Sequence, residues 1–343
     1  MRFVEASGSA HERGRTMGLA FADVIDGTLE FNRGYVTSRG IDASDLERLL
    51  APYLAASRDA FPELVELLQG VADGADRPFD EVFLANAFEE VYGILELETP
   101  APAGLERCTD VALRGPGCTL LAHDEQWYAG EEGAVGMVLD VPDDGPALLA
   151  PMLAGEVALV GMNEHGLAVG AMSLSGRDER QGIPRALVAR DVLNARDRAD
   201  AIARATRASR AGGYSYLMVL PGGDAFVVES TATASAVLER ITHTNHALDP
   251  SVAAAAFEPS EGSLSRLARA EQLAPQADVT VEAALALLAD HDADGMDICC
   301  HPDPSDGAEG STILFAMVCD VERREMWVTD GHPCTAPAER FAI

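Results

Sequence analysis

The chain has 343 residues, of which 48% are hydrophobic, and its formal net charge is −31 at pH 7. This length and apolar content allow a substantial buried core, while the negative charge repels nucleic acid and anionic membrane surfaces, so we expect neither as a partner. All 25 basic side chains are arginines, which excludes Schiff-base chemistry on lysine and the lysine of a phosphate-binding P-loop.

The first hundred residues or so read as helical. Apolar residues recur at helical spacing over residues 12–30, from Pro62 to about Gly74, and from Phe79 to about Tyr92. No window approaches the roughly 18 apolar residues of a membrane helix. The start of the chain also lacks the basic and apolar stretches of a secretory signal. We therefore expect a soluble, cytoplasmic protein.

Residues 98–104 contain two prolines and a glycine, which predicts an exposed loop suited to a chain break. Beyond it the pattern changes to short β-branched or alternating runs, so we divide the chain into a helical segment, 1–107, and a core, 108–343. Strand pairs and helices in separate blocks favour a layered α+β fold. The strands predicted in the core, apart from the first two, are 135–141, 147–153, 157–160, 167–174, 214–220, 225–229, 236–241, 312–319 and 326–329, and its helices are 184–194, 197–208, 263–274 and 279–290.

The first two strands of the core begin at a cysteine. Residues 108–113 read as a strand, 114–117 as a tight turn and 119–127 as a second strand. A cysteine at the start of a strand can be the nucleophile of an enzyme that cuts its own backbone. Cleavage between Arg107 and Cys108 would free an α-amino group with a pKa of about 7.7–8, close to the thiol's value of about 8.5. One residue would then hold both nucleophile and base.

The other cysteines read as ordinary buried thiols. Without a secretion signal we expect no disulfides, and the absence of a C-x-x-C pair argues against a structural zinc site. Cys118 lies only nine residues before Trp127, which leaves no room for two strands and a turn, so we interpret it as a core cysteine. The six cysteines are Cys108, Cys118, Cys299, Cys300, Cys319 and Cys334.

Several segments, in this order, resemble a known family. They are Gly8–Gly18 (G-x-x-x-E-x-G-x-x-x-G), Cys108-Thr109 with the strand through Trp127, Gly161–Leu167 (G-x-N-x-x-G-L), His243–His246 (containing T-N-H), Ile298-Cys299, and the ending Phe315, Asp320 and Gly331–Pro333. The chain resembles the acyl-coenzyme A:6-aminopenicillanate (isopenicillin N) acyltransferase family. These are autoproteolytic N-terminal-nucleophile hydrolases related to choloylglycine hydrolases.

The resemblance implies a four-layer αββα sandwich and a precursor that is cut before its cysteine. It implies that Cys108 is the nucleophile and Asn245 an oxyanion-hole donor, while Ser173 stands where bile-salt-hydrolase relatives have another asparagine. It further implies a small-molecule acyl amide or thioester as substrate. No cofactor is implied, although a coenzyme A thioester is possible as acyl donor, and hydrolysis and acyl transfer both stay open because they differ only in the acceptor.

The chain also departs from the family pattern. The family aspartate of the second strand aligns with Gln126, the family arginine before the late strand falls at Glu309-Gly310, and the residue before the nucleophile is Arg107 rather than glycine. An alternative is therefore an unprocessed, catalytically silent member that binds a small acyl ligand.

Further residues are candidates for lining the site. Asp124 and Glu125 are adjacent on a strand and point to opposite faces, so at most one of them faces the site. His243 and His246 offer a third alternative, a metal-dependent hydrolase, but nearby acidic residues are scarce, and we expect no metal. The possible site-lining residues are Thr109, Asp124, Gln126, Ser173 and His246.

Overall fold

The computed structural model describes residues 1–98, 108–292, 297–303 and 305–343, and its core is built on two β-sheets. Sheet A runs, in spatial order, β1 (Arg2–Gly8), β4 (Val135–Pro142), β5 (Leu148–Leu153), β6 (Gly161–Asn163), β7 (Ala168–Leu174), β8 (Gly213–Leu220), β9 (Asp224–Ser230) and β10 (Ser235–Leu238). Sheet B runs β11 (Thr242–His243), β2 (Thr109–Gly115), β3 (Cys118–Tyr128), β12 (Ser311–Asp320), β13 (Glu325–Asp330) and β14 (Ala338–Ala342).

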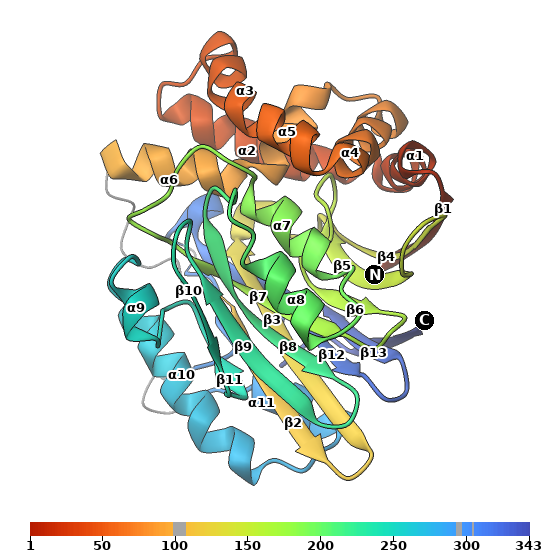
Figure 1. Cartoon of the computed structure of the whole chain (residues 1–343), viewed down its shortest axis with the longest axis vertical. Helices are drawn as coiled ribbons and strands as arrows, with labels where there is room; N and C mark the ends of the chain where they lie inside the picture. The colour runs from red at the N-terminus through yellow and green to blue at the C-terminus, as the bar shows by residue number, and fades with distance from the viewer. Residues whose placement is uncertain (99–107, 293–296, 304) are drawn as a thin grey trace.

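The sheets pack face to face, with β2 and β3 against β7 and β8, and helices cover the outer faces (Figure 1). Sheet A is covered by α7 (Arg185–Val192) and α8 (Arg198–Ala205), and sheet B by α10 (Glu261–Leu273) and α11 (Val281–Leu288). The short helix α9 (Pro250–Ala253) lies beside β10. The expected α+β, four-layer αββα sandwich is therefore confirmed.

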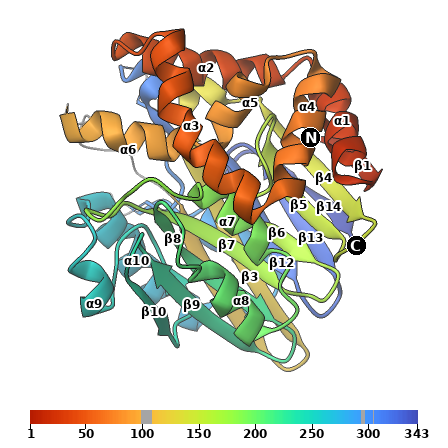
Figure 2. The ribbon, with the colours of Figure 1, turned by 45° about the horizontal axis from the view of Figure 1, so that its top comes forward.

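The remaining helices lie together across one end of the sandwich, as Figures 1 and 2 show. They are α1 (Ala10–Phe21), α2 (Ile25–Ser38), α3 (Ala43–Ala60), α4 (Pro62–Ala75), α5 (Phe79–Asn86) and α6 (Phe88–Glu98). The first begins at a capping box, in which Ser9 Oγ accepts from the amide of Glu12 and the Glu12 carboxylate accepts from the amide of Ser9. Among the described residues, no helix combines the length and apolarity needed to cross a bilayer.

Two features of this end differ from the sequence prediction. The first residues form β1 rather than helix, and β1 pairs in parallel with β4, so the N-terminal segment supplies an edge strand to sheet A. The predicted strand at 157–160 is wrong, because this apolar run lines a cavity instead of joining a sheet. The amide of Val157 donates to Asn86 Oδ1 at 2.8 Å, which satisfies a backbone group that a ladder would otherwise use.

Glycines allow α1 and α4 to cross in backbone contact. A Cβ atom at Gly14 would lie 1.9 Å from the carbonyl oxygen of Leu67, and one at Gly70 would lie 2.2 Å from that of His11. The glycine motif near the start of the chain is therefore a helix-packing device.

The hairpin of β2 and β3 matches its prediction closely. The strands pair antiparallel, with Thr109 opposite Asp124 and Gly115 opposite Cys118, and Gly117 turns the chain with φ +68°. Cys108 directly precedes β2. Cys118, the first residue of β3, is half-buried and lies at the far end of the hairpin from Cys108.

Candidate active site

The strand β3 divides its side chains between the two faces of sheet B. Leu121 belongs to the core between the sheets, whereas Leu120 and Ala122 pack with the helices outside. Because side chains alternate along a strand, His123 and Glu125 face sheet A while Asp124 and Gln126 face outward. The structure thus places Glu125 on the same side as the cavity described next.

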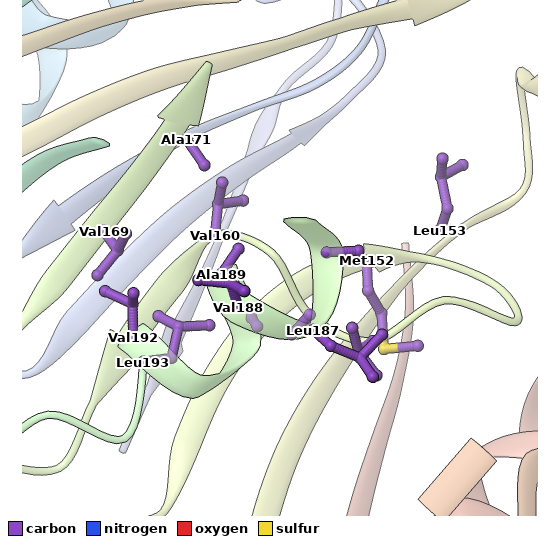
Figure 3. Close-up of a cluster of buried hydrophobic side chains, with 14 of the residues drawn as sticks. Met152, Leu153, Val160, Val169, Ala171, Leu187, Val188, Ala189, Val192 and Leu193 are labelled. Carbon is purple, nitrogen blue, oxygen red and sulfur yellow. The ribbon is translucent and has the colours of Figure 1, made fainter. Parts of the chain in front are cut away.

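A cavity that is partly open to solvent lies where the helical end meets the sheets. Its wall is mostly apolar. Figure 3 shows a cluster of buried hydrophobic side chains in which Met152 and Val160, two of the residues that line the cavity, lie beside the side chains of α7. The polar groups on its wall are mostly acidic. The charged and hydroxyl side chains that line it are Glu89, Glu90, Glu125, Glu156, Ser173, Arg185 and Tyr214, and Cys108 lines it as well.

The Cys108 thiol is buried, with 3% of the residue exposed, and its Sγ lies 3.5 Å from Glu125 Oε1. Burial, and then the neighbouring Glu125 and Asp124 carboxyls, raise the pKa of the Cys108 thiol well above its usual value. In the uncut chain this thiol is therefore protonated at neutral pH and is a weak nucleophile.

A chain of buried ionisable groups leads away from the thiol between the sheets. Glu125 Oε2 lies 3.2 Å from His123 Nε2, and His123 Nδ1 lies 2.6 Å from Asp110 Oδ1. Burial by itself would lower the pKa of His123, but Asp110 and Glu125 raise it to about 10. The imidazole is therefore a cation at neutral pH that donates to both carboxyls. Cys108, His123 and Glu125 also place three potential ligand atoms within 4.8 Å of one another.

Behind Cys108, on the outer face of sheet B, Arg266 of α10 holds the backbone of this residue. Its Nη1 donates to the Cys108 carbonyl at 2.6 Å and to Thr109 Oγ1 at 3.0 Å. The amide of Thr109 donates to Asp124 Oδ1 at 2.6 Å. Burial raises the pKa of Asp124 to about 7, against the opposing effect of Arg266. Thr109 and Asp124 thus support the backbone next to Cys108 rather than facing the cavity.

Asn245 lies close to this arrangement, after β11. Its Oδ1 accepts from Arg266 Nη2 at 3.1 Å, and its Nδ2 donates to the carbonyl of Ser173 at 3.1 Å. A side-chain amide has two N–H donors, so this contact uses one of them. Arg266 therefore connects Cys108 and Asn245, which are 137 positions apart in the sequence.

Ser173 is the second candidate residue on the cavity wall. Its hydroxyl and that of Tyr214 both donate to the carboxylate of Glu89, on α6. Arg185 Nη1 lies 3.7 Å from the same carboxylate and is also paired with Glu90 and Glu179, so its positive charge is offset. These contacts fix the carboxylate of Glu89, in the first turn of α6, on the cavity wall.

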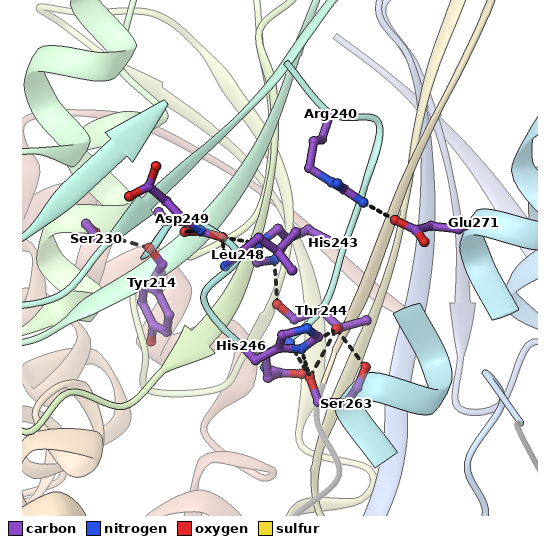
Figure 4. A network of polar contacts seen from close by, with 12 residues as sticks. Tyr214, Ser230, Arg240, His243, Thr244, His246, Leu248, Asp249, Ser263 and Glu271 are labelled. Carbon is purple, nitrogen blue, oxygen red and sulfur yellow. Dashed lines mark hydrogen bonds and ion pairs between the residues drawn. The ribbon is translucent and has the colours of Figure 1, made fainter. Parts of the chain in front are cut away.

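The two histidines beside Asn245 are engaged in a buried polar network (Figure 4). His243 contacts Glu229 Oε1 through Nε2 at 2.8 Å and the Thr244 carbonyl through Nδ1, and His246 Nδ1 contacts Ser263 Oγ at 2.8 Å. Burial, and then His243, lower the pKa of His246 to about 4. These contacts position the segment that carries Asn245 and leave His246 outside the residues that line the cavity.

The last two candidates are Gln126 and Arg107. Gln126 is fully buried on the outer face, where its Nε2 donates to Ser311 Oγ at 3.2 Å, while its backbone faces the Cys108 sulfur. Arg107, on the other side of the expected cleavage site, lies outside the described residues.

Sequence reasoning missed several of the polar groups around Cys108. The sequence alone does not say whether Asp124 or Glu125 faces the site. In the structure the side chains of β3 alternate, so that Glu125 lies on the same face as Leu121 and lines the cavity. No local signal marked Glu89, His123 or Arg266, because each reaches the site through a tertiary contact.

The chain is similar in sequence to known proteins. A family model described as acyl-coenzyme A:6-aminopenicillanic acid acyl-transferase matches residues 113–334. The acyl-coenzyme A:6-aminopenicillanic-acid-acyltransferase 40 kDa form of Emericella nidulans is 26% identical over 353 aligned positions, covering 100% of this chain and 96% of that protein. The beta-alanyl-dopamine/carcinine hydrolase of Drosophila melanogaster is 27% identical over 126 positions, covering 34% of this chain and 31% of that protein.

Solved structures give more distant similarities. Penicillin V acylase from Agrobacterium tumefaciens aligns with a TM-score of 0.48 and 14% identity, over 69% of this chain and 86% of that one. Conjugated bile acid hydrolase from Clostridium perfringens aligns with a TM-score of 0.44 and 12% identity, over 69% of this chain and 97% of that one.

Proposed function

Because the chain belongs to the acyl-coenzyme A:6-aminopenicillanic acid acyl-transferase family, we propose that it is a cysteine amidohydrolase or acyltransferase whose nucleophile is Cys108. The observation that carries the proposal is the thiol's position, on the wall of the acidic-apolar cavity with its backbone held by Arg266. Cleavage of the Arg107–Cys108 bond would convert this residue into the N-terminus of a second chain.

Cleavage supplies what the uncut site lacks. Burial and two carboxyls keep the thiol protonated before cleavage, and the freed α-amino group then offers a base within the same residue. The amine takes the thiol proton, and the thiolate attacks the substrate's amide carbon. The α-ammonium group returns that proton to the leaving amine, which leaves a thioester on Cys108. Water or a second amine then takes the acyl group, and the thiol is regenerated.

We assign the developing oxyanion to Asn245. One of its two N–H bonds goes to the Ser173 carbonyl, and the other is the proposed donor to the tetrahedral intermediate. Loss of one such donor typically lowers kcat by about 10²–10³. Glu125 lies 3.5 Å from the sulfur and is the proposed partner of the new α-ammonium group. It would take the place of the family aspartate, which aligns with the uncharged Gln126.

The cavity's charge narrows the substrate class. Burial raises the pKa of Glu156 well above its usual value, so this carboxyl is neutral at pH 7. Arg185, the one cation among the described residues that line the cavity, is already paired with Glu89, Glu90 and Glu179. An anionic acyl donor such as a coenzyme A thioester would therefore find no unpaired positive charge there. We therefore favour linear amides whose acyl group is apolar and whose amine part is neutral or cationic.

The intact mass of the purified protein, measured under denaturing and reducing conditions, tests the nucleophile. We expect two fragments that divide between Arg107 and Cys108. The Cys108→Ala variant should stay whole, and Cys118→Ala, a matched loss of a thiol at the far end of the hairpin, should still be cut.

A matched pair of amides that share an acyl group but differ in the charge of the amine then tests the substrate class, by kcat/KM.

The alternative is an unprocessed family member that binds a small acyl ligand without turnover. The observations that favour it are the uncharged Gln126, in place of the family aspartate, and the protonated Cys108 thiol. A single full-length species after long incubation, with equal ligand binding by wild type and Cys108→Ala, would replace the enzymatic proposal with this one.

A further inference from the structure

Four potential metal-binding side chains, which come from three segments of the chain, lie close together outside the cavity. His291 follows α11, Cys299 and His301 precede β12, and Cys334 lies between β13 and β14. One ligand atom from each, an imidazole nitrogen or a thiol sulfur, lies within 4.8 Å of all the others. The proposed catalysis uses none of these residues.

The distances fit tetrahedral coordination. His301 Nε2 lies 3.3 Å from Cys334 Sγ and 3.9 Å from Cys299 Sγ. With Zn–S bonds of about 2.3 Å and Zn–N bonds of about 2.0 Å at tetrahedral angles, a sulfur and a nitrogen ligand are about 3.5 Å apart. The two observed separations bracket this value, and all four ligand atoms lie within 4.8 Å of one another.

Neighbouring groups hold the imidazole rings. His301 stacks on His332, with ring centroids 4.2 Å apart and planes 9° apart, and also on His291 at 5.1 Å. His332 Nε2 is fixed 3.1 Å from Thr312 Oγ1 on β12. The Asp297 carboxylate lies 3.8 Å from His291 Nδ1, beyond hydrogen-bond distance.

We propose that His291, Cys299, His301 and Cys334 form a structural site for a divalent transition metal, with zinc as the best match. Two thiolates neutralise a dication, and a tetrahedral set of two sulfurs and two nitrogens is typical of zinc. Four protein ligands leave no open position, so the ion's role is to tie the segment after α11 and the turn after β13 to each other. This departs from our argument against a structural zinc site, which rested on the absence of a C-x-x-C pair.

Cobalt(II) binding to the full-length, chelator-treated protein tests the site. We expect one equivalent of Co²⁺, with the visible bands of tetrahedral cobalt and the near-ultraviolet charge-transfer band of cobalt–thiolate bonds. Cys334→Ser and His301→Ala should lose the tetrahedral spectrum. Cys300→Ser, a loss of the neighbouring thiol outside the ligand set, should keep it, and elemental analysis of the untreated wild type should show zinc.

Two results would overturn the proposal. One is a wild type that binds no cobalt, or binds it with a spectrum unaffected by Cys334→Ser. The other is a disulfide between Cys299 and Cys334 in freshly purified protein, seen by peptide mapping without reductant. The same measurement on the Cys108→Ala variant separates this question from the proposed function, because metal binding should not depend on cleavage.

Discussion

His123 forms a buried charged network with Asp110 and Glu125. His123, Asp110 and the Cys108 thiol are almost completely buried, and Glu125 connects the imidazole with the thiol. An unpaired charge at this depth would cost several kcal/mol, so the three ionisable side chains are interdependent. Their arrangement couples the protonation of the site to the stability of the sheet pair.

This coupling predicts a pH-dependent loss of stability in the His123→Gln variant. The folded-state pKa of about 10 lies above the unfolded value of 6.5, so the imidazolium's stabilising contribution is complete below pH 6.5 and disappears as the pH rises through 10. We expect the variant to be less stable by about 3–5 kcal/mol at pH 6, with a smaller difference at pH 10.

Urea unfolding at the two pH values measures the difference. His165→Gln, a substitution of an exposed histidine, serves as control and should change little at either pH. A constant difference between wild type and His123→Gln across this range would show that the imidazole is not charged in the folded protein.

At the scale of elements, the contact of α1 with α4 is the most constrained packing in the N-terminal segment. Gly14 and Gly18 of α1 face α4, and Gly70 and Gly74 of α4 face α1, and a Cβ at any of them would overlap backbone atoms. Close backbone approach of this kind leaves no side chain that can move aside. The crossing in turn places β1 at the edge of sheet A.

Gly14→Ala should therefore destabilise the protein by about 2 kcal/mol or more, because the added methyl would meet the Leu67 carbonyl at 1.9 Å. Gly34→Ala is the matched control, since Gly34 lies within α2 and a Cβ there meets nothing within 4 Å. The control should be neutral or more stable by up to about 1 kcal/mol. Equal midpoints for the two variants in chemical denaturation would contradict this account of the crossing.

At the scale of the whole molecule, the N-terminal segment is integrated into the core. Its β1 pairs with β4, and Arg13 Nε donates to Asp140 Oδ1 at 2.5 Å, on the same carboxylate that Arg190 of α7 binds at 2.7 Å. Glu89 and Phe88 of α6 line the cavity. The segment therefore supplies part of the proposed substrate site as well as an edge of the sheet.

The two fragments expected from cleavage before Cys108 should consequently stay together. Native size-exclusion chromatography of the cut protein should give one species at the position of the uncut Cys108→Ala variant, and the fragments should separate only in denaturant. Separation in native buffer, with the larger fragment still folded, would mean that the β1–β4 pairing and the buried ion pair are dispensable.

The sequence by itself determined the class of fold, the hairpin that starts at Cys108 and the order of most core elements. These follow from local turn chemistry and from periodicity, as at Gly117, where a positive φ is needed. The resemblance added Asn245 and Ser173 as candidates and strengthened the case for Cys108, and the roles of all three stay predictions.

Only the tertiary structure decided how the site is surrounded. It turned residues 2–8 into an edge strand and 157–160 into cavity wall, because pairing with β4 and burial against the cavity outweigh local pattern. It also brought Arg266 to Cys108 and His301 to Cys334. Periodicity describes neighbours within one element, whereas these contacts join residues far apart in the chain, and their positions depend on how the layers pack.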